Sequence, residues 1–106
     1  MTHQEKDSRH YFDPENFSAL RDFFGGYLHE DFAVEYGSAA DALRTFLSDA
    51  SGDEIQNVRE EWQRFRNTLK DRPFTETQAA LHRLGAAWQP VNPQEVTTLD
   101  EILSRA

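Results

Sequence analysis

The sequence predicts an all-α protein, a compact single-domain bundle of about five helices, and three observations favour this fold class. Apolar residues recur at intervals of three and four along most of the chain, which is the spacing of amphipathic helices. Capping residues precede several of these stretches. Residues 32–36 offer the one short candidate for a strand. The length of 106 residues fits one domain, so we expect a flexible N-terminal tail over residues 1–13 and a single helical domain over residues 14–106.

The first helix is predicted to begin after Asp13, with Asp13 as N-cap and Pro14 at the first helical position. Its apolar face would carry Phe17, Leu20 and Phe24. The pair Gly25-Gly26 predicts the end of this helix or a bend, because two glycines cost roughly 2 kcal/mol in a helix interior.

The second and third helices have clearer start signals. Ser38 followed by Asp41 predicts one start, and the capping box of Ser51 and Glu54 predicts the other. The apolar faces would carry Leu43, Phe46 and Leu47 in the second helix and Ile55, Val58, Trp62, Phe65 and Leu69 in the third. Pro73 would follow the end of the third helix. Its charged residues, expected to face water or a partner, are Arg59, Glu60, Arg66 and Lys70.

The fourth helix is predicted to begin with a capping box of Thr75 and Gln78. Its apolar positions would be Ala79, Leu81, Leu84 and Trp88. The two prolines in residues 89–93 indicate a loop. A last short helix is expected to begin at Thr98, with Glu101 as the capping partner and Leu99, Ile102 and Leu103 as docking residues.

Composition excludes several classes of protein. Without cysteine, the chain has no disulfide framework, thiolate nucleophile or cysteine-based zinc site. No apolar stretch resembles a signal peptide or a membrane span, so we expect a cytoplasmic protein without a membrane partner. A net charge of −8 argues against nucleic acid as a partner, because such binding depends on lysine and arginine.

Acidic residues are concentrated in residues 29–54, where seven carboxylates accompany a single base, Arg44. A solvated face is the ordinary explanation of such a run. The alternative is a functional acidic surface, which would attract a basic protein and speed its encounter. The predicted partner-binding residues are Glu30, Asp31, Glu35, Asp41, Asp49, Asp53 and Glu54.

The sequence favours no catalytic, cofactor-binding or metal site. The cluster His29-Glu30-Asp31 suggests metal or proton-transfer chemistry, and a small metal enzyme or hydrolase would use it. However, adjacent residues on a helix point in different directions, and the chain has no H-E-x-x-H, G-x-S-x-G or P-loop motif. A structural role near the glycine pair, or a contact with a partner, fits His29 better. Trp62 and Trp88 are expected in the core.

The segment of residues 26–32, GYLHEDF, followed by EYGS at residues 35–38, resembles small bacterial immunity proteins of contact-dependent growth inhibition systems. The resemblance extends over about residues 14–88 and includes Leu84-Gly85, with Glu30 where the family pattern has glutamine. It implies a cytoplasmic protein that binds a cognate toxin domain in a 1:1 complex. The toxin is expected to be a basic protein and a nuclease. The alternative is a small helical adaptor that binds a host protein through the charged face of the third helix.

Overall fold

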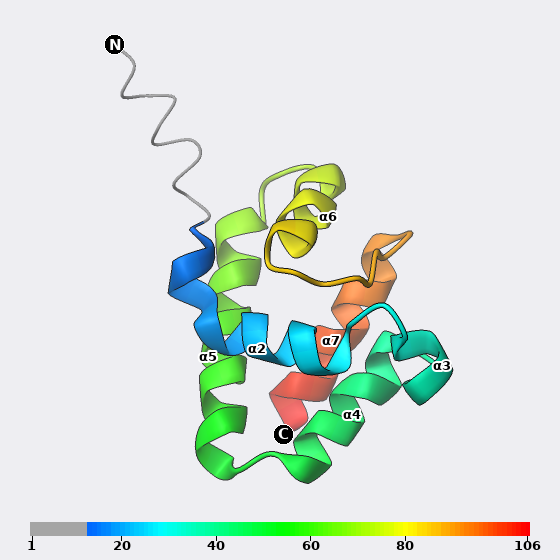
Figure 1. The fold of residues 1–106 in the computed structure, drawn as a ribbon. Helices are drawn as coiled ribbons and strands as arrows, with labels where there is room; N and C mark the ends of the chain where they lie inside the picture. Colours follow the sequence, from blue (N-terminus) through cyan, green and yellow to red (C-terminus); the bar gives the residue numbers. More distant parts are fainter. Residues whose placement is uncertain (1–12) are drawn as a thin grey trace.

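The computed structural model describes residues 13–106, and within them it contains helices and no strand (Figure 1). The predicted all-α class is therefore confirmed. Apart from Asp13, the expected tail lies outside the described residues. The elements are the 3-10 helix η1 (Pro14–Phe17) and the α-helices α2 (Ser18–Tyr27), α3 (Phe32–Tyr36), α4 (Ala39–Asp49), α5 (Gly52–Leu69), α6 (Phe74–Arg83) and α7 (Pro93–Arg105).

The five longer helices surround one core. Helix α2 packs against α5 and α4, while α7 packs against α4 and α5 (Figure 1). The short α3 packs against α4. Each longer helix contributes buried apolar side chains, so burial of these faces supplies the main stabilisation of the bundle. The largest fully buried side chains include Phe24, Phe65, Leu20, Leu28, Leu43, Leu81, Leu84 and Leu99.

Three predicted helix starts are confirmed by their side-chain caps. Asp13 accepts a hydrogen bond from the backbone N–H of Glu15 at 3.0 Å. The Ser38 hydroxyl accepts one from the N–H of Asp41 at 3.1 Å. Ser51 and Glu54 form both bonds of a capping box, at 3.2 and 2.9 Å. These caps satisfy amides that have no partner within their own helix.

The prediction that the helix ends at the glycine pair is wrong. Gly25 and Gly26 lie inside α2, which continues to Tyr27. Neither glycine has positive φ, and a Cβ atom at either position would meet nothing within 4 Å. They therefore provide neither a C-cap nor a close helix contact. The apolar residues on either side, Phe24 and Leu28, are fully buried, and this packing outweighs the low helix propensity of two glycines.

Residues 32–36 form a helix, α3, and not a strand. Backbone bonds from the N–H groups of Val34 and Glu35 to the Asp31 carbonyl begin this turn. Gly37, at φ 95°, ends it in a conformation that favours glycine. Local hydrogen bonds at both ends explain why a short apolar run adopts helix here.

The fourth predicted helix is displaced. Helix α6 begins at Phe74 without a side-chain cap, so Thr75 is not the N-cap. It ends at Arg83, and Gly85 follows at φ 94°. Trp88 consequently lies beyond the helix, although it is buried as expected, with 4% of its surface exposed. The left-handed conformation of Gly85 turns the chain out of the helix.

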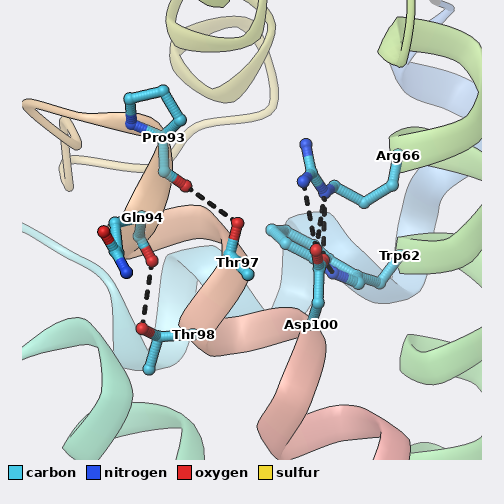
Figure 2. A network of polar contacts seen from close by, with 7 residues as sticks. All are labelled: Trp62, Arg66, Pro93, Gln94, Thr97, Thr98 and Asp100. Atoms are coloured by element: carbon cyan, nitrogen blue, oxygen red, sulfur yellow. Dashed lines mark hydrogen bonds and ion pairs between the residues drawn. The ribbon is translucent and has the colours of Figure 1, made fainter.

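The last helix begins earlier than predicted. Asn92 is the N-cap of α7 and accepts a hydrogen bond from the N–H of Glu95 at 3.1 Å. Pro93 occupies the first helical position, where its missing N–H is not needed. Thr98 therefore lies within the helix, and its hydroxyl donates to the carbonyl of Gln94 (Figure 2).

A polar cluster joins α5 to α7 (Figure 2). The indole N–H of Trp62 donates to Asp100 Oδ1 at 2.7 Å. Arg66 donates to both oxygens of the same carboxylate, at 2.9 and 3.0 Å. Arg59, on the same helix, donates to the Ala106 carbonyl. The prediction that Arg59 and Arg66 face water or a partner is therefore wrong, because both are half-buried and bonded to the C-terminal part of the chain.

Glu61 on α5 caps a different helix. Its Oε1 accepts a hydrogen bond at 3.0 Å from the N–H of Leu20, in the first turn of α2. Helix α2 has no capping side chain of its own at Phe17. Glu61 thus satisfies an amide at the start of α2, and its negative charge suits the positive end of the helix dipole.

We expect Glu61→Ala to lower the free energy of unfolding by about 1 kcal/mol, the usual cost of losing an N-cap. Urea denaturation of the purified protein measures the change. Glu61→Gln keeps an acceptor oxygen and should lose less. Equal stability of the alanine variant and the unmodified protein would contradict the capping role.

Candidate binding surface

Tyr27 occupies the centre of an aromatic cluster between α2, α3 and α4. Its ring stacks on Phe23 with centroids 5.8 Å apart and on Tyr36 with centroids 5.7 Å apart. It also meets Phe46 edge to face at 5.5 Å. These contacts fix α3 against the two longer helices, since offset and edge-to-face pairs add to the effect of burial.

His29 organises the turn between α2 and α3. Its Nδ1 accepts a hydrogen bond from the N–H of Asp31 at 3.1 Å, and its Nε2 lies 2.7 Å from Glu35 Oε1. Because Nδ1 is an acceptor, the ring proton lies on Nε2 and is donated to Glu35. The prediction that His29 has a structural role is confirmed. Its hydrogen bonds are made in the turn that follows the glycine pair.

A groove of about 480 Å³ lies between α2, the end of α4 and the start of α5. Its aromatic part consists of Phe23, Tyr27 and Phe46. Its other lining residues are Ser18, Ala19, Asp22, Asp49, Ala50, Glu54, Asn57, Val58 and Glu61. Four carboxylates thus surround an aromatic hollow, and none of its lining residues is a lysine or arginine.

The hydroxyl of Tyr27 reaches one of these carboxylates, lying 3.4 Å from Asp49 Oδ2. Partial burial, and then the negative charge of Asp49, raise the pKa of Tyr27. Burial also raises the pKa of Tyr36, with further contributions from Glu35 and Asp49. Both tyrosines therefore remain protonated at neutral pH, and Tyr27 acts as a donor to Asp49.

The seven predicted partner-binding residues are all exposed, but they form two groups at opposite ends of α4. Asp49 and Glu54 line the groove, and Asp53 lies beside Glu54 in the first turn of α5. The second group precedes α4 or lies in its first turn, and comprises Glu30, Asp31, Glu35 and Asp41. Helix α4 has 11 residues, so its two ends lie roughly 16 Å apart, while Tyr36 lies close enough to Glu35 and Asp49 for both to raise its pKa.

Several of these carboxylates already have partners within the chain. Asp41 pairs with Arg44 at 2.9 Å, Glu35 bonds to His29, and Glu54 belongs to the Ser51 capping box. An exposed ion pair such as Asp41–Arg44 contributes little stability, but each of these contacts holds its carboxylate in a defined position. The acidic residues therefore have structural roles in addition to any role in binding.

Two carboxylates of the groove, Asp22 and Glu61, are not among the seven residues predicted from the sequence. Both lie outside residues 29–54, the stretch in which charge was counted. Helical spacing is the signal in the sequence that could have identified them. Glu61 follows Glu54 by seven residues on α5, and Asp22 follows Ser18 by four residues on α2, so each lies on the same helix face as another groove residue.

Within residues 13–106, no three histidine, aspartate or glutamate side chains gather closely enough to bind a metal ion. No helix in this part of the chain has the length and apolar character needed to cross a membrane.

Comparison with known proteins identifies a family. A family model described as CdiI immunity protein matches residues 16–104, which extend from η1 into the last turn of α7. Searches of curated proteins and of solved structures find no match. The family match confirms the resemblance inferred from residues 26–38.

Proposed function

The chain belongs to the CdiI immunity protein family, and from this premise we propose that it binds and neutralises its cognate toxin domain. We propose further that it binds the toxin one to one through an acidic surface and covers the toxin's active site. The family match over residues 16–104 is the observation that carries the toxin-neutralising function. The acidic surface consists of Glu30, Asp31, Glu35, Asp41, Asp49, Asp53 and Glu54.

Charge supports the choice of this surface and a basic toxin. All seven carboxylates are exposed, and the chain carries a net charge of −8. Nucleases bind the phosphate backbone with lysine and arginine, so a nuclease active site presents the complementary charge. An acidic protein bound at that active site would exclude nucleic acid, because its carboxylates would pair with the same lysine and arginine side chains. A nuclease toxin is therefore the class that we propose.

Protection of cells tests the function. Cells that express the toxin domain encoded beside this gene should survive when the immunity protein is also produced and should die without it. Deleting that toxin gene should make the immunity protein dispensable. Continued toxicity in the presence of the intact, folded protein would overturn the proposed function. If cells still required the protein after deletion of the toxin gene, the result would favour the adaptor alternative. The structure lends that alternative no support, because Arg59 and Arg66 of the charged face of α5 bond within the chain.

We expect the double variant Asp31→Lys/Asp53→Lys to bind the toxin about tenfold more slowly at low salt, because it reverses one charge in each acidic group. The difference should shrink as salt rises, since the residues are exposed and screened. Stopped-flow or surface-plasmon-resonance association rates at several salt concentrations measure the effect.

A matched control reverses two exposed acids elsewhere, Asp71→Lys/Glu101→Lys, with the same change in net charge. This control should slow association by less than the first pair. Equal effects of the two pairs would show that net charge, and not the acidic surface, sets the rate.

A further inference from the structure

We propose that a hollow between the end of α5 and the starts of α6 and α7 binds a phosphate group, free or carried by a small molecule. This basic hollow measures about 410 Å³, and its lining includes Arg66, Lys70, Arg72, Phe74, Thr77 and Asp100. None of the seven carboxylates of the acidic surface is among its lining residues. The site is therefore separate from the proposed toxin contact, and its test needs no toxin.

Thr77, the fourth residue of α6, is the observation that points to a ligand. The residue is only 4% exposed, yet its hydroxyl has no hydrogen-bond partner among the described residues. Four other helical threonines each donate to the carbonyl four residues earlier, namely Thr45, Thr68, Thr97 and Thr98. A polar group so far removed from water is normally hydrogen-bonded.

The Thr77 hydroxyl faces the basic hollow. Among residues 13–106, Arg59 Nε is the one fully enclosed side-chain nitrogen or oxygen without a partner. The Thr77 oxygen also lacks a partner, so it must retain some exposed surface within the small exposed fraction of the residue. Because Thr77 lines the basic hollow, that exposed surface lies there. The hydroxyl is thus available as a donor to a ligand.

The basic hollow is positively charged although the protein is acidic. Three bases line it, Arg66, Lys70 and Arg72, against one acid, Asp100. Arg66 is paired with Asp100, and Arg72 lies 3.4 Å from Glu76, so these two arginines contribute mainly charge. Lys70 is exposed, and its ammonium has no partner among the described residues. Lys70 is therefore the cation that would bond directly to an anion.

The start of α6 adds to this positive potential. Helix α6 has 10 residues and begins at Phe74 without a side-chain cap, whereas Ser38, Ser51 and Asn92 cap α4, α5 and α7. Because Phe74 and Thr77 both line the basic hollow, the hollow lies beside the first turn of α6. The N–H groups of an uncapped first turn and the helix dipole both favour a bound anion.

The variety of donors favours phosphate over a carboxylate. The ammonium of Lys70 follows the end of α5, while the Thr77 hydroxyl and the first-turn amides belong to α6. A phosphate group has a charge of about −1.5 to −2 at neutral pH and three acceptor oxygens that point in different directions. A carboxylate has a single charge and two oxygens in one plane. Phosphate can therefore bond to more of these donors at once.

Titration of the full chain with small anions tests the site. The probes are inorganic phosphate, glycerol 3-phosphate and acetate, added at constant pH and ionic strength and followed by ¹H–¹⁵N nuclear magnetic resonance. We expect phosphate to shift amide signals of residues 66–77 and to bind at least about fivefold more tightly than acetate. Tighter binding of glycerol 3-phosphate than of inorganic phosphate would support a phosphate ester as the ligand, and the reverse would support the free ion. No shift over residues 66–77 with either phosphate probe would overturn the site, and equal binding of acetate would overturn the choice of phosphate.

Thr77→Val separates a ligand contact from a structural role, because it keeps the shape of the side chain and removes only the hydroxyl. We expect it to weaken phosphate binding about fivefold. It should not destabilise the fold, since the lost hydroxyl has no partner within the described residues; circular dichroism and urea denaturation check this. Thr75→Val, at an exposed threonine of the same helix, should change phosphate binding less than about twofold. Equal phosphate binding by Thr77→Val and the unmodified protein would overturn the inference.

Lys70→Gln tests the cation of the site and should also weaken phosphate binding about fivefold. Arg83→Gln is its matched control, because it removes one positive charge from an exposed residue at the other end of α6. The control should weaken binding less than about twofold. Equal losses in the two variants would show that net charge, and not the basic hollow, governs the affinity for phosphate.

Discussion

Replacing Trp88 with alanine is expected to lower the free energy of unfolding by about 3 to 5 kcal/mol, the usual cost of removing a large buried aromatic side chain. Trp88 lies in the segment between α6 and α7 and is only 4% exposed. Its indole N–H also lies 3.4 Å from Glu95 Oε1 in the first turn of α7. The substitution would therefore leave a cavity and remove a contact between the segment and the helix.

The backbone of this segment is held in place on both sides of Trp88. The N–H of Ala87 donates to the carbonyl of Leu28 at 2.8 Å, and the side chain of Gln78 donates to the carbonyl of Pro90 at 2.8 Å. Such anchoring limits how far the chain can collapse into the cavity, so we expect the full cost.

Guanidinium denaturation, followed by circular dichroism, measures the loss. Trp88→Phe preserves most of the bulk and should lose much less than the alanine variant. Val91→Ala changes an exposed side chain of the same segment and should stay within about 0.5 kcal/mol. If Trp88→Ala behaves like Val91→Ala, the segment does not belong to the core.

We expect Asp100→Ala to lower the free energy of unfolding by about 2 to 3 kcal/mol, because it removes the acceptor shared by Trp62 and Arg66. The side chains of Arg66 and Asp100 remain 32% and 34% exposed. Water can therefore solvate the freed guanidinium, and the expected loss is below that for a fully buried ion pair. Thermal and urea denaturation measure the change.

Asp100→Asn keeps an acceptor for the Trp62 indole but removes the charge, so we expect about half of the alanine effect. Glu101→Ala is the matched surface control, because Glu101 is the exposed neighbour on the same helix. It should change stability by less than about 0.5 kcal/mol. An Asp100→Ala variant as stable as this control would show that the cluster in Figure 2 contributes nothing measurable.

Helix starts were predictable where the cap is local in the sequence. Asp13, Ser38 and Ser51 each accept an N–H within three residues, and a pattern of side chains reveals such bonds. The start of α7 has the same kind of local signal in Asn92 and Glu95, but the two prolines in residues 89–93 also favour a loop. The cap of α2 comes from Glu61, which is 41 residues away, and no local pattern contains that information.

The sequence predicts which acidic residues the candidate surface contains, but not how these residues are arranged in space. The concentration of charge along the chain predicted seven carboxylates, and the structure shows that all seven are exposed. The charge pattern could not show that α4 divides them into two groups, nor that Asp22 and Glu61 join Asp49 and Glu54 around one groove. That grouping depends on how α2 crosses α5, which tertiary packing determines.

Helix α5 lines the groove with one face and bonds to α7 with another. Substitutions on the two faces can therefore accumulate independently of each other. Exposed groove residues such as Asp22 and Asp49 can be replaced while the bonds of Asp100 remain intact. Glu61 is the exception, because it lines the groove and also caps α2. Any substitution that changes the charge of the groove at this position would also remove the cap of α2. One carboxylate thus limits which side chains this face of α5 can accept without a loss of stability.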